Sequence, residues 1–277
     1  MRYYRNKTIL ITGAASGIGR KFAETVADYG VTLILWARNP SPLLNFRRTI
    51  SNKTEVLVSA VDVTDATAIA AEADQLIKGA FVPDIIINCA GVVTGNNYFC
   101  DQQADEIEQT LMVNTVGSML VVNAFLNQMI LRGSGQIVNI ASAAGYLGHP
   151  RMSVYAASKS AIISWSESLR LELAEQSPGI SVTCVIPGYV DTGMFEGVTA
   201  PRLVPLLQTE ALVQKMIKKI RKRRFRVEAP LMIRFTPLLK AILPQRAFDW
   251  LAGRVFRVYR SMDTFEGKRP ASSLSEM

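Results

Sequence analysis

Two residues that could transfer a proton stand four positions apart in this chain. Tyr155 and Lys159 occur in the segment YAASK, and this spacing places both side chains on one face of a helix. A phenol with an ordinary pKa of about 10 is a poor acid or base at neutral pH, but a nearby ammonium favours its ionised form. The pair could therefore perform acid–base chemistry. A surface pair of Tyr and Lys, which is common on helices, is the alternative interpretation.

A glycine-rich turn near the N-terminus could hold phosphate groups. It reads TGAASGIG from Thr12 to Gly19 and lies between a short apolar run and a segment with helical periodicity. Its glycines would allow a tight turn and close approach of a ligand, and the N–H groups at the start of the helix suit a pyrophosphate. A turn without a ligand is the alternative. The predicted contacts are Gly13, Ala15, Ser16, Gly17, Ile18 and Gly19.

Six apolar runs rich in β-branched residues predict the strands that position these motifs. They occupy residues 8–12, 31–37, 55–61, 84–90, 136–141 and 180–186. The segments between them have helical periodicity and are long enough for crossover helices, and a last strand is expected at 227–230. The pattern predicts an α/β fold, a Rossmann-type doubly wound three-layer sandwich with a mostly seven-stranded parallel sheet.

One continuous domain is expected over residues 1–277, because no linker or repeat divides it. Its core would cover about 7–195. Residues 196–262 would form a substrate lid and a basic, apolar extension, and 263–277 a mobile tail.

Residues that follow the second, third and fourth strands could bind the rest of a dinucleotide. Arg38 stands where an acidic residue would bind the ribose of NAD, and it could instead bind a 2′-phosphate. NADP(H) is therefore preferred and NAD(H) remains open, with a solvated loop arginine as the alternative. Asp62 could contact the adenine, or it could cap a helix starting near Thr64. The other predicted contacts here are Asn39, Val63, Asn88, Ala90 and Gly91.

Composition excludes several other classes of protein. The 277 residues, 49% of them hydrophobic, can bury a large core. His149 is the one histidine, and the three cysteines are irregularly spaced, so neither a metal site nor a disulfide framework is expected. The net charge of +8 favours an anionic partner such as a cofactor phosphate, a lipid or a nucleic acid. The chain lacks a secretory signal and a long uninterrupted apolar segment, and a cytoplasmic location is expected.

Five motifs in this order resemble the short-chain dehydrogenase/reductase family from about Lys7 to Thr192. They are TGAASGIG, NCAG at 88–91, Asn114, Ser142 with YAASK, and IPGYVDT at 186–192. The resemblance implies that Ser142 holds the substrate oxygen and that Tyr155 donates or accepts its proton. It implies that Lys159 binds the nicotinamide ribose and tunes Tyr155, while Asn114 holds a water joining Lys159 to a proton relay. Nicotinamide contacts are implied for Pro187, Gly188, Val190 and Thr192.

In NCAG the chain departs from the family, which usually has a second Asn at the position of Cys89. This cysteine is expected to pack behind the loop, which would leave catalysis intact.

The same resemblance implies an oxidoreductase that interconverts a carbonyl and an alcohol by hydride transfer with NADP(H). The segment LILWARN and the hydrophobic C-terminal region are similar to the subgroup of retinol and hydroxysteroid dehydrogenases, which implies a lipophilic substrate such as a retinoid, a steroid or a long-chain aldehyde or ketone. His149, Met194 and Phe195 are candidates for the substrate pocket, with a surface loop or the core as alternatives. A catalytically silent dinucleotide-binding scaffold is the competing function.

The basic stretch from Lys215 to Arg226 combines cations with Met216, Ile217, Ile220 and Phe225, and the following segment, 237–259, mixes large apolar residues with arginines. Peripheral attachment to anionic lipid is one interpretation, and a solvated face over a subunit contact or lid is the other. Nucleic-acid binding is disfavoured, because Phe225 is the single aromatic residue there that could stack on a base. The resemblance implies a homodimer or homotetramer that pairs through helices at about 101–131 and 153–176.

Overall fold

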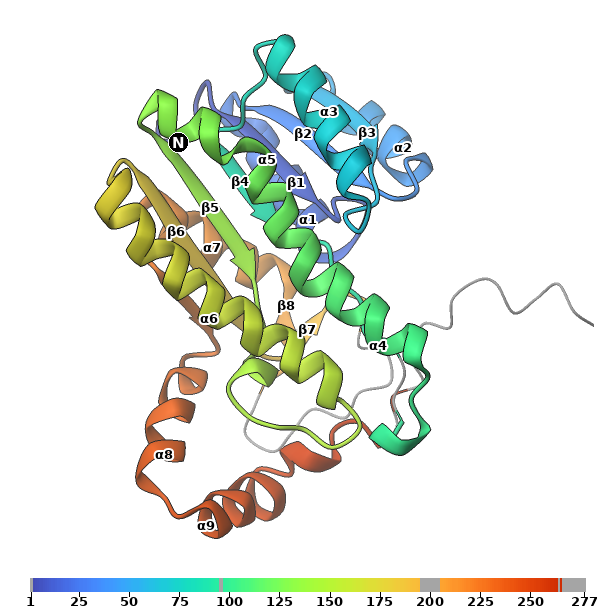
Figure 1. Ribbon diagram of the computed structural model, residues 1–277, viewed down its shortest axis with the longest axis vertical. Coiled ribbons are helices and arrows are strands. Elements are labelled where there is room, and N and C mark those ends of the chain that lie inside the picture. Colours follow the sequence, from blue (N-terminus) through green and yellow to red (C-terminus); the bar gives the residue numbers. More distant parts are fainter. Residues whose placement is uncertain (1, 95–96, 195–204, 264, 266–277) are drawn as a thin grey trace, which may run out of the picture.

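A seven-stranded parallel sheet forms the centre of the computed structural model, which describes residues 2–94, 97–194, 205–263 and 265 (Figure 1). The strand order is β3-β2-β1-β4-β5-β6-β9, and every pairing is parallel. The strands are β1 (Thr8–Thr12), β2 (Thr32–Ala37), β3 (Glu55–Ala60), β4 (Ile85–Asn88), β5 (Gly135–Ile140), β6 (Ile180–Pro187) and β9 (Arg226–Ala229). The predicted sheet is confirmed, with strand ends shifted by at most two residues.

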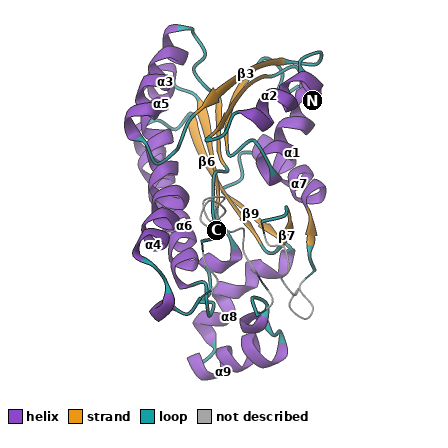
Figure 2. Cartoon of the chain, turned by 90° about the vertical axis from the view of Figure 1, so that its right-hand side faces the viewer, coloured by secondary structure: helices purple, strands orange, loops and turns teal. Residues whose placement is uncertain are grey.

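Helices cover both faces of the sheet, so the three-layer sandwich is also confirmed (Figure 2). One layer consists of α1 (Gly17–Val26), α2 (Ser41–Ile50) and α7 (Thr209–Arg221). The other consists of α3 (Ala66–Lys78), α5 (Gly117–Arg132) and α6 (Ser153–Gln176). Successive strand residues serve opposite layers: Ile9 belongs to the core cluster of α1 and α7, and Leu10 to that of α3 and α5. This alternation explains why the strands are apolar nearly throughout.

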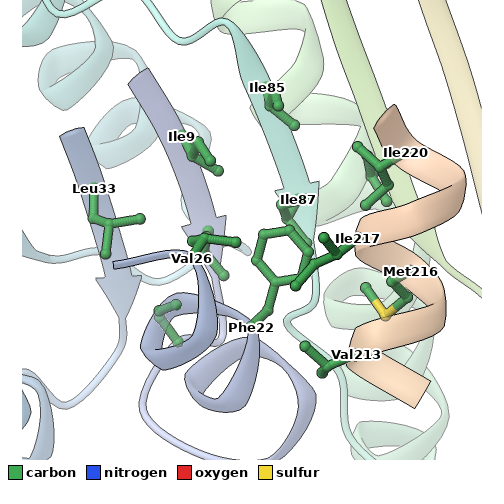
Figure 3. Close-up of a cluster of buried hydrophobic side chains, with 14 of the residues drawn as sticks. Ile9, Phe22, Val26, Leu33, Ile85, Ile87, Val213, Met216, Ile217 and Ile220 are labelled. Carbon is green, nitrogen blue, oxygen red and sulfur yellow. The ribbon is translucent and has the colours of Figure 1, made fainter. Parts of the chain in front are cut away.

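Figure 3 shows how α7 joins the core on the α1 side. Phe22 of α1 lies beside Ile87 of β4 and Ile217 of α7. Met216, Ile217 and Ile220 are completely buried. The interpretation in which these apolar residues of the basic stretch contact lipid is therefore wrong, since a residue packed against the sheet cannot insert into a membrane.

The long helix expected at 101–131 is interrupted in its middle. It consists of α4 (Ala104–Leu111), a π-helical turn (Met112–Val116) and α5. Among the described residues, this composite helix is the one stretch long and apolar enough to cross a membrane, yet half of its most apolar window is buried inside the fold. Phe125 and Met129 pack against the sheet, so the helix serves the core.

The C-terminal part of the chain adds short elements below the sheet. β7 (Val190–Asp191) pairs with β8 (Leu207–Gln208) in a small separate sheet that the sequence did not predict. After β9 come a 3-10 turn, η5 (Leu231–Phe235), then α8 (Thr236–Ile242), α9 (Gln245–Trp250), a π-helical turn, η6 (Leu251–Val255), and a 3-10 turn, η7 (Val258–Arg260). α8 and α9 project from the lower end of the molecule in both views (Figures 1 and 2). Of the expected tail at 263–277 the structure describes Asp263 and Phe265, and the remainder lies outside the described residues.

Candidate active site

The functional residues gather at one edge of the sheet. Because all the strands of this sheet are parallel, their carboxyl ends meet there. β1 and β4 are neighbours at the point where the strand order reverses, since β1 leads to β2 and β3 while β4 leads to β5 and β6. A crevice at such a switch point is where open α/β sheets bind their ligands.

The glycine-rich turn between β1 and α1 is shaped by close backbone contacts. Gly13 has a φ of 64°, and a Cβ atom there would lie 2.8 Å from the backbone of Ala90. A Cβ on Gly19 would lie 2.8 Å from the carbonyl oxygen of Gly13. The Thr12 hydroxyl accepts hydrogen bonds from the N–H groups of Cys89 and Ala90, both at 3.1 Å. The turn is thus held against the end of β4, and only glycine fits it.

The start of α1 has the features of an anion-binding site. Ser16, its N-cap residue, makes no side-chain capping hydrogen bond, and the first turn contains no acidic residue. The first N–H groups of the helix therefore suit a pyrophosphate, whose charge also favours the positive end of the helix dipole. Ala15, Gly17 and Ile18 are partly exposed beside it, and Thr192 lies over Gly17, 3.3 Å from where a Cβ atom would be. The residues at this turn fit a dinucleotide.

Arg38 and Asn39 follow the end of β2, next to the glycine-rich turn's strand β1. Both are exposed, and Arg38 forms no ion pair with any described carboxylate. The Asn39 side chain accepts a hydrogen bond from the Ser41 N–H at 3.0 Å and so shapes the start of α2. The Arg38 guanidinium is available for an anionic group.

Asp62 does not cap α3. Its carboxylate accepts hydrogen bonds from the N–H and hydroxyl of Thr64 at 2.9 and 2.8 Å, whereas Asp65 is the N-cap residue and accepts from the first-turn N–H groups. The capping interpretation of Asp62 is therefore wrong, because the helix begins later than the sequence indicated. Val63 is buried, and its carbonyl packs closely against Gly117.

The loop after β4 lies between the glycine-rich turn and the side chains of Asn114 and Lys159. A Cβ atom on Gly91 would lie 3.3 Å from Asn114 Oδ1 and 3.6 Å from Lys159 Nζ. The Asn88 side chain instead points into the interior, where it donates to Asn139 Oδ1 at 2.9 Å. Cys89 packs against the core on the α1 side, as expected, and burial raises the pKa of its thiol to about 11.

Ser142, Tyr155 and Lys159 come together at the ends of β5 and α6. Tyr155 and Ser142 share a hydrogen bond, and Lys159 Nζ lies 5.7 Å from the centre of the Tyr155 ring. Lys159 also donates to the carbonyl oxygen of Ile140 at 3.0 Å. Tyr155 is 7% exposed and Lys159 5%. The surface-pair interpretation is therefore wrong.

Burial shifts the pKa values of Tyr155 and Lys159. Burial raises the pKa of Tyr155 to about 12, although its hydrogen bond with Ser142 acts in the opposite direction. Burial also lowers the pKa of Lys159 to about 8. The expected lowering of the Tyr155 pKa by the ammonium is not found. Lys159 donates to a backbone carbonyl and lies beside the Tyr155 ring, so the effect of burial on the phenol exceeds that of the ammonium. At neutral pH the phenol holds its proton and can donate it.

Asn114 lies in the π-helical turn, a distortion that is frequent at functional sites. Its amide donates to the Val92 carbonyl at 2.9 Å and to the Ser158 hydroxyl at 3.1 Å, while its oxygen accepts from the Val92 N–H at 2.7 Å. Asn114 therefore joins the helix to the loop after β4 and to α6. The water-binding role implied for it stays a prediction.

A mostly apolar pocket opens beside Ser142 and Tyr155. Its lining residues are Ser142, Ala143, Ala144, Leu147, His149, Met152, Tyr155, Gly188, Tyr189 and Val258. Met262 and Phe265 pack with Met152 and Tyr155 next to it. The C-terminal segment thus closes one side of the pocket. Tyr189, Val258, Met262 and Phe265 were missed from the sequence, since only Tyr189 stands in a motif and the others meet the pocket from far along the chain.

His149 fastens that segment to the pocket. It is 6% exposed, with Nδ1 2.8 Å from the Pro150 carbonyl oxygen and Nε2 2.7 Å from that of Val258. Nε2 also lies 2.9 Å from the Ser261 hydroxyl, which contacts Tyr189 OH at 2.5 Å. The surface-loop interpretation of His149 is therefore wrong.

The remaining predicted residues lie on the loop after β6 or beyond it. Pro187 ends β6, and the Gly188 N–H donates to the Ala229 carbonyl at 2.7 Å. Val190 is buried in β7. Met194 is partly buried, but it is not among the described residues that line the pocket. Phe195 lies outside the described residues.

Comparison with known sequences identifies a family and several relatives. The short chain dehydrogenase family matches residues 7–202. Epidermal retinol dehydrogenase 2 of Mus musculus is 37% identical over 266 residues, which cover 94% of this chain and 85% of the mouse protein. Estradiol 17-beta-dehydrogenase 11 of Homo sapiens is 32% identical, and the match covers 86% of this chain and 79% of the human protein.

Solved structures give the same result. A short-chain dehydrogenase/reductase from Burkholderia phymatum in complex with NAD superposes with a TM-score of 0.79 and 26% identity, covering 87% of this chain and 95% of the other. A short-chain dehydrogenase from Sphingobium yanoikuyae in complex with NADPH has a TM-score of 0.75 and 29% identity, covering 86% and 96%. This chain belongs to the short-chain dehydrogenase/reductase family of nicotinamide-dependent oxidoreductases, and retinol and hydroxysteroid dehydrogenases are among its relatives.

Proposed function

We propose that this protein interconverts a carbonyl and an alcohol on a lipophilic molecule with NADP(H), with Tyr155 as the general acid and base. The observation that carries the proposal is the position of the Tyr155 phenol. It shares a hydrogen bond with Ser142, lies beside Lys159 and lines an apolar pocket. A substrate oxygen that entered this pocket could meet both hydroxyl groups.

Each part of the crevice has a role in holding the cofactor, which supplies or accepts the hydride when bound. The Gly13–Gly19 turn and the start of α1 would hold the pyrophosphate. Arg38 would bind the 2′-phosphate, and Lys159, which lies close to Gly91, would bind the nicotinamide ribose. Pro187, Gly188, Val190 and Thr192 would contact the nicotinamide end.

Acid–base chemistry favours reduction at neutral pH. With a pKa of about 12, Tyr155 carries a proton that it can give to the carbonyl oxygen while Ser142 orients that oxygen. In oxidation the phenol must first lose its proton, and Lys159 would favour its charged form as substrate and cofactor order the site. The apolar lining of the pocket supports a retinoid, a steroid or a long-chain aldehyde or ketone as substrate.

A comparison of Tyr155→Phe with wild type tests the reaction. Consumption of NADPH by wild type with retinal, a keto-steroid or a long-chain aldehyde is expected, and the variant should lose roughly 10²- to 10⁴-fold in kcat, the usual contribution of a general acid. Tyr98→Phe, at a tyrosine that is 56% exposed, is the matched control. If wild type and Tyr155→Phe both bind NADPH, while neither turns over any carbonyl or alcohol, the binding-scaffold function is correct instead.

Arg38→Ala tests the cofactor preference. The Kd of NADPH should rise roughly tenfold, as expected for loss of one charge-assisted hydrogen bond, and the Kd of NADH should stay unchanged. Arg48→Ala, at an exposed arginine of α2, is the control. An equal change for both dinucleotides would contradict a role in binding the 2′-phosphate.

The same proposal covers assembly and location. Residues 1–277 form one domain in which the segment after β7 serves as lid and extension, two or four copies pair through α5 and α6, and the protein works in the cytoplasm at a membrane surface. Exposed Leu131 and Leu171 on these helices support the pairing. Light scattering at micromolar concentration tests it, and a monomer would contradict it.

A further inference from the structure

The helical segment after β9 turns its apolar side toward solvent. Phe235, at the start of α8, and Leu238 and Ile242 within it recur at intervals of about one helical turn, so they share one face. Their exposed fractions are 51%, 55% and 68%, and Leu231 in the preceding η5 is 62% exposed. Trp250, in the neighbouring α9, is 62% exposed. An amphipathic helix in a protein core shows the opposite arrangement, with its apolar face buried.

Free cations accompany this apolar face. Residues 231–260, which we call the docking lobe, contain one acidic residue, Asp249, and six basic residues. Asp249 accepts hydrogen bonds from Gln245 and Tyr259. Within the described chain, none of the six basic residues forms an ion pair. All six are exposed: Arg234, Lys240, Arg246, Arg254, Arg257 and Arg260.

We propose that the docking lobe binds an anionic membrane surface. Exposed large apolar side chains mixed with unpaired cations match the boundary between headgroups and acyl chains of an anionic bilayer. A second copy of this chain fits less well, because a two-fold contact would bring the same cationic surface against itself. The segment Lys215–Arg226 does not provide this surface, since its apolar residues Met216, Ile217 and Ile220 belong to the core.

The docking lobe is continuous with the substrate pocket. Val258, near the end of the lobe, lines the pocket beside Tyr155. His149 holds the same residue by its carbonyl oxygen. A lipophilic substrate could therefore pass from the membrane into the pocket with little exposure to water. This passage of substrate rests on the proposed reaction, whereas membrane binding deepens the proposed location and does not depend on the reaction.

Binding of the full chain to vesicles tests the inference. Wild type should bind vesicles of phosphatidylcholine with phosphatidylserine better than vesicles of phosphatidylcholine alone, and salt should weaken the binding. The double variants Leu238→Ser/Ile242→Ser and Arg246→Gln/Arg254→Gln should each reduce partitioning roughly tenfold or more. Circular dichroism confirms that they fold, which is expected because all four side chains are exposed.

Two matched controls locate the surface. Leu44→Ser removes an apolar side chain that is 47% exposed in α2, and Lys218→Gln/Lys222→Gln removes exposed cations at the end of α7. Both should bind vesicles like wild type. The inference is overturned if the lobe variants bind like wild type, or if the α7 variant loses as much binding as they do. It is also overturned if Leu238→Ser/Ile242→Ser dissociates an oligomer while wild type ignores both vesicles, because a second copy then covers the lobe. None of these readouts depends on turnover, so a failed reaction and a failed membrane contact are distinguishable.

Discussion

The glycine-rich turn and the C-terminal wall of the pocket lie at the same edge of the sheet but are built in opposite ways. The C-terminal wall consists of Val258, Met262 and Phe265. The turn is fixed by backbone: Gly13 and Gly19 leave no room for a Cβ atom, and Thr12 ties the turn to β4. The wall is fixed by side chains, through the hydrogen bonds of His149 and the packing of Phe265. A site made of backbone tolerates little change, whereas one made of side chains can vary without disturbing the sheet. The difference suits a fixed cofactor beside a variable substrate.

The largest expected effect comes from adding one methyl group to the turn. Gly13→Ala places a Cβ atom 2.8 Å from the backbone of Ala90 at a φ of 64°. We expect the free energy of unfolding to fall by about 2–4 kcal/mol, from left-handed strain and a forced backbone shift. NADPH affinity should fall more than roughly 100-fold, because the shift moves the N–H groups that face the pyrophosphate.

Gly133→Ala is the matched control for this change. Gly133 has a φ of 69°, but nothing lies within 4 Å of a Cβ atom there. Only the backbone strain remains, so unfolding should become easier by about 1–2 kcal/mol with no change in NADPH affinity. Urea unfolding and calorimetric titration measure both quantities. Equal losses in the two variants would show that φ, and not the contact with β4, determines the turn.

A pH profile tests the charge of Lys159, which lies close to Gly91 and beside Tyr155. Lys159 has a pKa lowered to about 8 by burial, so it is charged below that pH and neutral above it. kcat/KM for NADPH reports ionisations of the free enzyme. It should be flat up to about pH 8 and then fall, approaching tenfold per pH unit, as the charge that meets the ribose is lost. Tyr155, with a pKa of about 12, does not titrate over this range.

A profile that stays flat up to about pH 10, near the ordinary pKa of lysine, would contradict this assignment. It would mean that the charge of Lys159 is not needed, or that burial does not lower its pKa in the working enzyme.

The sequence predicted the first region far better than the second. The seven strands, the turn at Gly13–Gly19 and the pair of Tyr155 and Lys159 follow from local patterns, since apolar runs, glycine spacing and a four-residue interval each act over a short stretch of chain. The sequence also placed Ser142 at the end of a strand. Predicting these features requires no knowledge of the residues that pack against them.

The second region depends on contacts between distant segments. His149 was a candidate for the pocket with a surface loop as the alternative, because nothing near it in sequence indicates that it contacts Val258 and Ser261. For Met216 the sequence left lipid contact open as one of two interpretations, because a basic amphipathic stretch looks the same whether its apolar side meets a membrane or the sheet. The π-helical turn around Asn114 also has no local signal, since it accommodates bonds to the loop after β4 and to α6.

His149→Ala should loosen the C-terminal wall and leave the turn intact. The variant removes the imidazole contacts of the buried Ser261 hydroxyl and of the Val258 carbonyl, which costs about 1–3 kcal/mol. We expect faster trypsin cleavage after Arg257 and Arg260 and a several-fold higher KM for the carbonyl, with unchanged NADPH affinity. Ser160→Ala, which removes a hydrogen bond of an exposed hydroxyl to Gly145, is the control. Cleavage at the rate of wild type would show that packing alone holds the wall.

The smallest expected effect concerns a surface ion pair between α1, which follows the glycine-rich turn, and α7. Lys21 of α1 lies 2.6 Å from Glu210 of α7, but their side chains are 35% and 51% exposed. Glu210→Gln should change the free energy of unfolding by less than about 1 kcal/mol, because solvent screens such pairs. Ile217→Ala, in the completely buried contact between the same helices (Figure 3), should cost about 2–5 kcal/mol. Urea unfolding of both variants decides whether apolar packing or surface charge joins α7 to the nucleotide-binding region. A larger loss for Glu210→Gln than for Ile217→Ala would mean that α7 is attached to α1 by charge and can separate from it at high salt.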